Sequence, residues 1–282
     1  MELEAGLGLE AFAERIAARI RSRHPAAEVG YVEGDARALE VRWPDGGQAT
    51  ASLDNLWRAY RQSGGEGVEP ELSRWIEILA PLPDATRAEA RLVALVRPAA
   101  MLVAAMSQTG GAGRLVAFPL VEEELFVVLA RDCPDRIELL TQAERSELPA
   151  TDEELFVDAV KNVLADLSIQ RHGGGPVWML TAGGNYEASL LLHAALWRDL
   201  GREVEGELIA SVPCRDLIYY TGSEEPGGPE LLRRITERMH RQGSYPISGR
   251  LLRFTGSAWE LAVLAEEAGA APEEPDEREE EE

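Results

Sequence analysis

The stretch from Gly175 to Gly222 constrains the fold more than any other part of the chain. A short apolar run at 177–180 leads through a glycine turn into a helical pattern, and two further apolar runs follow at 208–212 and 217–220. Runs of four or five apolar residues are typical of buried strands and too short for helices. Pro213 is expected to end the second strand, because proline cannot donate a hydrogen bond to a central ladder. The stretch therefore predicts a strand, a turn, a helix and two more strands.

The predicted helix begins just after Gly183 and Gly184, which tolerate unusual backbone angles. Asn185 is suited to the N-cap, since its side-chain oxygen can accept a bond from an early helical N–H. Glu187 falls in the first turn, where the helix dipole favours a negative charge. Residues at helical spacing form the apolar face that would pack on the sheet: Leu190, Leu191, Ala194, Trp197 and Leu200.

Polar residues are densest in this same apolar region, and we interpret six of them as candidate binding residues. They are Asn185, Tyr186, Glu187, Ser189, Arg215 and Asp216. A glycine turn before a helix can also hold an anion, but Glu187 already supplies a negative charge there. Cys214 with a histidine is a second alternative, disfavoured because a lone cysteine beside proline is more often a small buried hydrophobe.

Arg215 and Asp216 admit two interpretations. They are either a charged pair at a binding site or structural groups, one capping a turn and the other forming an ion pair. Neighbours on a strand point to opposite faces, so both face one pocket only if Pro213 bends the strand. Arginine keeps its charge and needs an acceptor, and Asp216 is turned away. We therefore expect Arg215 to pair with a carboxylate distant in sequence. Glu187 is the best single candidate, and its helix would pack on the strand in a β-α-β arrangement.

The remainder of the chain predicts an α+β fold, with antiparallel sheets covered by helices in two lobes. Residues 1–82 form the first lobe, residues 83–265 form the second, and the boundary lies near Pro81–Asp84. The first lobe contains a helix at 9–23, a hairpin at 38–53, a short helix near 56–60, a loop at 63–70 and a helix from Pro70. The second adds strands at 125–130 and 137–141, a capping box at Thr151 and Glu154, a helix from Pro229 and a hairpin at 247–264. Residues 92–105 fit either a helix, which their alanines favour, or two strand pieces broken at Pro98.

The acidic tail at 266–282 is predicted to be disordered. It holds ten acidic residues and one arginine, without an apolar anchor that would offset the entropy of ordering. We expect that deleting it leaves the fold intact. The tail carries −9 of the formal net charge of −22, so residues 1–265 carry −13. Such an acidic body argues against binding to nucleic acid, whose phosphates require clustered Lys and Arg.

No metal, redox or cofactor motif is present. Cys133 and Cys214 lack CxxC spacing, the four histidines lack metal-ligand spacing, and GGAG at 110–113 has no lysine after it as a phosphate loop requires. The N-terminus lacks the features of a signal peptide, and no apolar run reaches the length of a membrane span. We therefore expect a cytoplasmic protein without a cofactor or a membrane partner.

Two segments carry a resemblance to a known family. GGNYEASLLL at 183–192, followed by VPCRDLIYYTGS at 212–223, resembles the paired signature of the YtpQ-like family of bacterial proteins, the domain of unknown function 1444. The helix TDEELFVDAVKNVLA after ELFVVLARD has the same relative position, so the resemblance covers roughly Leu92 to Leu261 by motif order. It implies extended structure at 92–105 and a cytoplasmic bacterial protein with no established activity, and it supplies no catalytic residues.

The predicted function is a non-catalytic binding or adaptor module for a protein partner or a small molecule. The alternative is an enzyme that acts on a small anionic substrate through Arg215, Asp216, Asn185 and Glu187. Convergence of these four side chains in one pocket would favour the enzyme.

Overall fold

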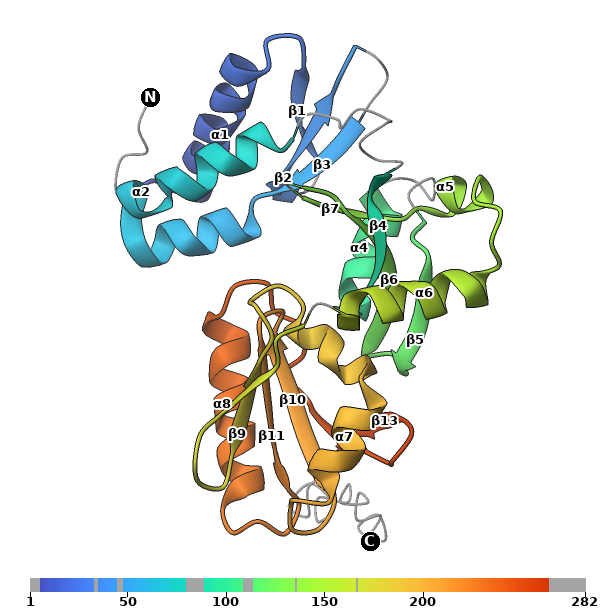
Figure 1. The fold of residues 1–282 in the computed structure, drawn as a ribbon. Helices are drawn as coiled ribbons and strands as arrows, with labels where there is room; N and C mark the ends of the chain where they lie inside the picture. Colours follow the sequence, from blue (N-terminus) through green and yellow to red (C-terminus); the bar gives the residue numbers. More distant parts are fainter. Residues whose placement is uncertain are drawn as a thin grey trace, which may run out of the picture.

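The computed structural model describes residues 6–32, 35–44, 48–79, 89–108, 114–134, 136–165 and 167–263. In these ranges the chain forms antiparallel sheets, each covered by helices (Figure 1). This confirms the predicted α+β class. The boundary at 81–84, the glycine cluster at 110–113 and the tail at 266–282 lie outside the described residues, so the division into lobes stays a prediction.

The N-terminal part packs two helices on a three-stranded sheet of order β1-β2-β3. Its elements are α1 (Leu9–Arg23), β1 (Glu28–Val32), β2 (Asp35–Arg42), β3 (Gln48–Ser52) and α2 (Asp54–Glu77). Helix α1 has the predicted bounds, and its apolar face is fully buried against the sheet and α2. Strand β1 was not predicted, because its alternating polar residues give a weak pattern.

Helix α2 differs from the prediction, which placed a loop at 63–70. The helix continues through the glycines and Pro70, and it changes direction along its length (Figure 1). Glycine and an internal proline are common causes of a bend. Val68, at the centre of the predicted loop, is fully buried in the core beside α1. Burial of that side chain favours helical backbone over a solvent-exposed loop.

The middle part is a sheet of order β4-β6-β5, with β7 paired to β6. Its elements are β4 (Arg91–Pro98), α4 (Ala99–Gln108), β5 (Ala117–Val121), β6 (Leu125–Asp132), β7 (Ile137–Leu139), α5 (Gln142–Ser146) and α6 (Asp152–Ala165). Extended structure was predicted over 92–105 and is correct only as far as Pro98. The alanine-rich residues that follow form α4, in keeping with their high helix propensity.

The predicted capping box at the start of α6 is confirmed. The Thr151 backbone N–H donates to Glu154 Oε2 at 2.8 Å, and the Glu154 N–H donates to Thr151 Oγ1 at 3.3 Å. Leu155, Ala159 and Val163 then bury the helix against the sheet.

We predict that Thr151→Ala lowers the free energy of unfolding by about 1 kcal/mol, because an early helical N–H loses its acceptor. Urea denaturation of the purified chain measures the change. Glu153→Ala is the matched control, since Glu153 is exposed in the same turn and takes no part in the box. Equal effects of the two substitutions would contradict the prediction.

The C-terminal part is a six-stranded sheet of order β13-β12-β10-β11-β9-β8. Its elements are β8 (Gln170–His172), β9 (Trp178–Thr181), the 3-10 helix η1 (Glu187–Leu192), α7 (Ala194–Gly201), β10 (Leu208–Cys214), β11 (Leu217–Gly222), α8 (Gly228–Gln242), β12 (Leu251–Phe254) and β13 (Trp259–Leu261). Strands β9 and β10 are both antiparallel to β11 between them, so they run in the same direction. The connection through η1 and α7 is therefore a β-α-β unit split by β11. Helices α7 and α8 lie on opposite faces of this sheet (Figure 1).

The predicted helix from Asn185 to Leu200 forms in two pieces. Residues 187–192 are a 3-10 helix, and α7 begins only after His193, whose Nδ1 accepts a bond from the Leu196 N–H at 3.3 Å. His193 is therefore the N-cap, and Asn185 is an exposed loop residue. The predicted single apolar face is kept, because both pieces contribute to the same core.

Pro213 was expected to end its strand, and it lies within β10 instead. The β10–β11 register shifts between Ser211 and Cys214, and β12 pairs with β10 only as far as Ser211. The missing N–H of Pro213 falls in this irregular stretch, where proline is tolerated in a sheet.

Candidate functional site

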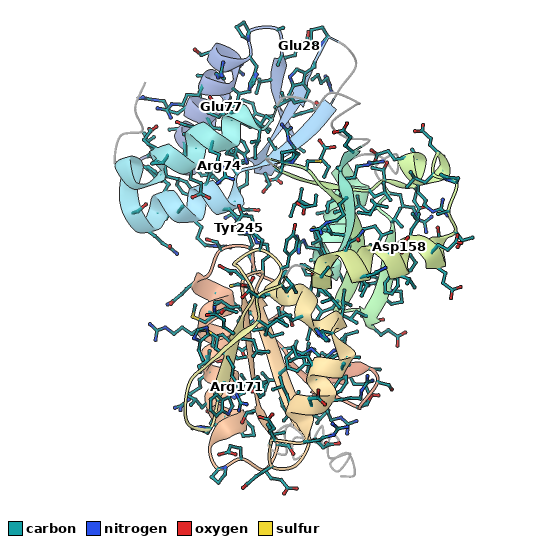
Figure 2. The ribbon with its side chains drawn as sticks, viewed as in Figure 1. Glu28, Arg74, Glu77, Asp158, Arg171 and Tyr245 are labelled. Atoms are coloured by element: carbon teal, nitrogen blue, oxygen red, sulfur yellow. The ribbon has the colours of Figure 1, made fainter. Side chains whose placement is uncertain are left out.

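The N-terminal and C-terminal parts of the chain meet through polar contacts near the end of α8. Arg58 Nη1 donates to the Gly243 carbonyl at 2.6 Å, and Gln62 Nε2 donates to the Gln242 carbonyl at 3.0 Å. Both donors lie on α2. Asn55 Oδ1 accepts a bond from the Tyr245 N–H at 3.2 Å. Figure 2 shows Tyr245 where the N-terminal, middle and C-terminal parts approach one another. We call the region around Asn55, Arg58, Gln62 and residues 242–245 the junction.

Tyr245 is held in an unusual backbone conformation at the junction. Its φ is 52°, in the left-handed region that a residue with a bulky side chain rarely adopts. Its N–H is bound to Asn55, and its carbonyl accepts the Arg215 N–H at 3.0 Å. The side chain is 39% exposed. Strained residues of this kind persist where surrounding contacts hold them, and they cluster at functional sites.

The Arg215 guanidinium lies over this ring, with Cζ 4.0 Å from the ring centroid. Arg215 is half-buried, and within the described residues its buried Nε has no hydrogen-bond partner. Arg215 and Asp216 form the turn of the β10–β11 hairpin, since Cys214 pairs with Leu217. Because the two residues lie in a turn and not on a strand, the alternation of strand faces does not point their side chains in opposite directions. Asp216 is exposed to solvent.

The expected ion pair between Arg215 and Glu187 is wrong. Glu187 is only 1% exposed, and its Oε1 accepts bonds from the N–H groups of Ala182 at 2.8 Å and Gly184 at 2.6 Å. Its Oε2 is buried with no hydrogen-bond partner among the described residues. The two segments meet through the backbone, because the Ala188 N–H donates to the Arg215 carbonyl at 3.0 Å. The Gly184 N–H, which an anion at the glycine turn would need as a donor, is therefore already bound to Glu187.

The remaining candidates have structural contacts. Ser189 is buried, and its Oγ accepts the Val96 N–H at 3.2 Å. Tyr186 is half-buried, and its hydroxyl donates to the Asp132 carboxylate. The pKa of Tyr186 is raised to about 12, chiefly by burial and also by the hydrogen bond to Asp132, which stabilises the protonated hydroxyl. Asn185 is exposed. The six candidates therefore do not line one pocket, and Arg215 is the member whose side chain lies at the junction.

Arg97 was missed by sequence reasoning. It lies close enough to Arg215 for the Arg215 charge to affect the ionisation of Arg97. Arg97 is near the end of β4, and its Nη1 donates to the Val96 carbonyl at 2.8 Å. The pKa of Arg97 is lowered to about 10, chiefly by burial and also by the nearby Arg215 charge, with Tyr186 acting in the opposite direction. The available signal was a charged residue directly after the apolar run at 92–96, but the sequence did not show that Arg215 lies near it in the fold.

Cys214 is not poised as a nucleophile. It is buried, and its Sγ donates to the Met239 carbonyl at 3.3 Å. The pKa of the thiol is raised to about 11, chiefly by burial and also by the Asp216 charge, with Arg58 acting in the opposite direction. The protonated thiol therefore predominates well above neutral pH.

We predict that Cys214 resists alkylation in the folded protein. At pH 8 a thiol with a pKa near 11 is a thiolate in about one molecule in a thousand. Iodoacetamide labelling followed by peptide mass spectrometry should modify Cys214 at least about tenfold more slowly in native protein than in urea-unfolded protein. Cys133→Ser removes the competing buried cysteine. Equal native and unfolded rates would contradict the prediction.

The part of the chain that the structure describes holds no group of three or more His, Cys, Asp or Glu side chains placed to bind a metal ion. Among the same residues, no helix combines the length and the apolar character needed to cross a bilayer.

Comparison with known proteins finds bacterial relatives at low identity. The chain is 24% identical over 139 residues to the UPF0354 protein BH3252 of Halalkalibacterium halodurans, an alignment that covers 48% of this chain and 52% of that protein. It is 23% identical over 235 residues to the UPF0354 protein OB2234 of Oceanobacillus iheyensis, which covers 81% and 85%. The first alignment thus spans about half the length of that relative. No family model and no solved structure matches the chain.

These similarities support membership of an uncharacterised bacterial family, and the names of the two relatives state no activity. The more specific YtpQ-like assignment stays a prediction.

Proposed function

We propose that the protein is a non-catalytic binding or adaptor module of the bacterial cytoplasm that binds a protein partner or a small molecule at the junction. The observation that carries the proposal is the Arg215 guanidinium stacked on the partly exposed Tyr245 ring. Tyrosine and arginine are the residues most enriched where proteins bind partners. Asn55, which accepts the Tyr245 N–H, and Arg58, which donates to the Gly243 carbonyl, hold the adjoining segment in place.

The positions of the other candidates favour binding over catalysis. An enzyme acting through Arg215, Asp216, Asn185 and Glu187 needs these side chains to converge on a substrate. Asn185 and Asp216 are exposed, whereas the Glu187 carboxylate is buried and bound to backbone N–H groups of its own loop. The formal net charge of −22 supports a ligand other than nucleic acid.

The test is affinity capture from an extract of the source organism, with mass spectrometry of both the proteins and the small molecules retained. We expect a ligand that the full chain retains and that the Arg215→Ala and Tyr245→Ala variants lose. Arg250→Ala is the matched control, because Arg250 is an exposed arginine in the same part of the chain.

Retention of the same ligand by all variants would place the binding surface elsewhere. Recovery of a chemically converted small molecule would show that the protein is an enzyme.

A further inference from the structure

Arg97 and Arg215 lie at the ends of strands from different sheets, and consecutive residues of η1 connect these ends. The Val96 N–H, beside Arg97, donates to Ser189 Oγ at 3.2 Å. The Ala188 N–H donates to the Arg215 carbonyl at 3.0 Å. The first turn of η1 therefore holds both strand ends, and it fixes the two arginines near one another.

Neither arginine has a carboxylate partner within the described ranges. Arg97 donates to the carbonyl of its own neighbour, and Arg215 lies on the Tyr245 ring with its buried Nε unbonded. Other arginines of limited exposure are paired. The side chains of Arg19, Arg131 and Arg145 are 19%, 13% and 17% exposed, and each has a carboxylate oxygen within 2.7 Å.

This arrangement is unfavourable without a ligand. Two like charges that share a half-buried site repel one another, and each loses part of its hydration. The chain has 50 acidic and 28 basic residues, so acidic residues to neutralise the pair are abundant in its composition. The guanidinium fork matches phosphate and carboxylate oxygens, and two forks facing one anion would bind it strongly.

We propose that Arg97 and Arg215 together bind an oxyanion, the phosphate or carboxylate group of a small-molecule ligand, at the junction. This inference rests on the proposed function, since it specifies the chemical group that the binding module recognises. Tyr245 positions the Arg215 guanidinium through its ring, whose centroid lies 4.0 Å from Arg215 Cζ.

Isothermal titration calorimetry of the full chain tests the inference with inorganic phosphate and with acetate as separate probes, in sodium chloride of matched ionic strength. We expect saturable binding of at least one probe. Phosphate binding with no acetate binding assigns the site to a phosphate group, and the reverse assigns it to a carboxylate. Arg97→Met and Arg215→Gln should each weaken binding at least about tenfold, and Arg250→Gln should leave it unchanged.

Thermal unfolding separates loss of binding from loss of the fold. Without a probe, Arg97→Met should unfold at the wild-type temperature or above it, because the substitution removes an uncompensated charge. With the probe, the wild type should gain stability and the variant should not. Equal binding by the wild type and both variants, or no saturable binding of either probe, would overturn the inference.

The two proposals fail in distinguishable ways. If neither probe binds but an extract ligand is retained and is lost in Arg215→Ala, the oxyanion site is wrong and the binding module stands. If a probe binds through both arginines but no ligand is retained from the extract, the oxyanion site stands and the proposed function fails.

Discussion

Replacement of Trp197 by alanine is expected to lower the free energy of unfolding by about 4 kcal/mol. Trp197 is fully buried in the core between α7 and the C-terminal sheet. Its ring packs edge-on against Tyr220 and Trp259, with centroids 6.0 and 5.0 Å away. Its Nε1 also donates to the Leu190 carbonyl at 2.6 Å. The substitution therefore opens a cavity, removes two aromatic contacts and removes one of the two hydrogen bonds to the Leu190 carbonyl, which keeps the bond from the His193 N–H.

Urea denaturation monitored by circular dichroism measures this effect. Trp197→Phe should cost less than Trp197→Ala, because it keeps most of the ring volume and loses the N–H donor. Val157→Ala is the control for apolar truncation, since Val157 is 56% exposed on α6, and it should change stability by less than about 0.5 kcal/mol. A loss below about 1 kcal/mol for Trp197→Ala would show that the surrounding core collapses into the cavity.

Patterns of local origin predicted much of the fold. The apolar spacing of α1 fixed both of its ends, and the short apolar runs that became β10 and β11 were recognised as strands. The capping box at Thr151 was found because both of its residues lie within four positions in the sequence. In each case, neighbouring residues carry the information that determines the element.

Features that depend on tertiary contacts were not predictable in the same way. The helix of α2 continues through a glycine-rich stretch because Val68 is buried against residues far away in the sequence. The break at His193 depends on a side-chain cap within an otherwise continuous apolar pattern. The approach of Arg97 to Arg215 requires two sheets to meet through η1, which no local pattern encodes.

The misassigned Arg215–Glu187 pair shows why the candidate site was predicted only in part. The sequence argument required a carboxylate for Arg215, and Glu187 was the nearest suitable one. The glycine turn, in which Gly183 and Gly184 adopt φ values of 106° and 89°, needs an acceptor for its own backbone N–H groups. Glu187 lies only a few residues away in the sequence and supplies that acceptor. Glu187 satisfies two of these loop N–H groups, and a short local contact of this kind costs less ordering entropy than a distant ion pair.

We therefore predict that Glu187→Ala lowers the free energy of unfolding by about 3 kcal/mol. The substitution leaves the N–H group of buried Ala182 without an acceptor, which costs about 1–3 kcal/mol, and the N–H group of the exposed Gly184 loses its bond to the same oxygen. Glu187→Gln should cost less than about 1 kcal/mol, because the amide oxygen replaces Oε1 as the acceptor and the position of Oε2 has no partner to lose. Chemical denaturation of the two variants gives both values. A similar large loss in both would show that the negative charge, rather than the acceptor, stabilises the loop.

A double-mutant cycle decides whether Glu187 and Arg215 act together. Because the structure gives them separate partners, the effects of Glu187→Ala and Arg215→Ala should add within about 0.5 kcal/mol. A buried ion pair would instead give a coupling of more than about 1 kcal/mol, since the first substitution would strand the second charge. Arg215→Ala alone should cost little stability, because its side chain contacts an exposed ring rather than a carboxylate. Two results together would separate the residue that holds the loop from the residue that holds the ligand. They are additivity in this cycle, and loss of phosphate or acetate binding in Arg215→Gln but not in Glu187→Gln.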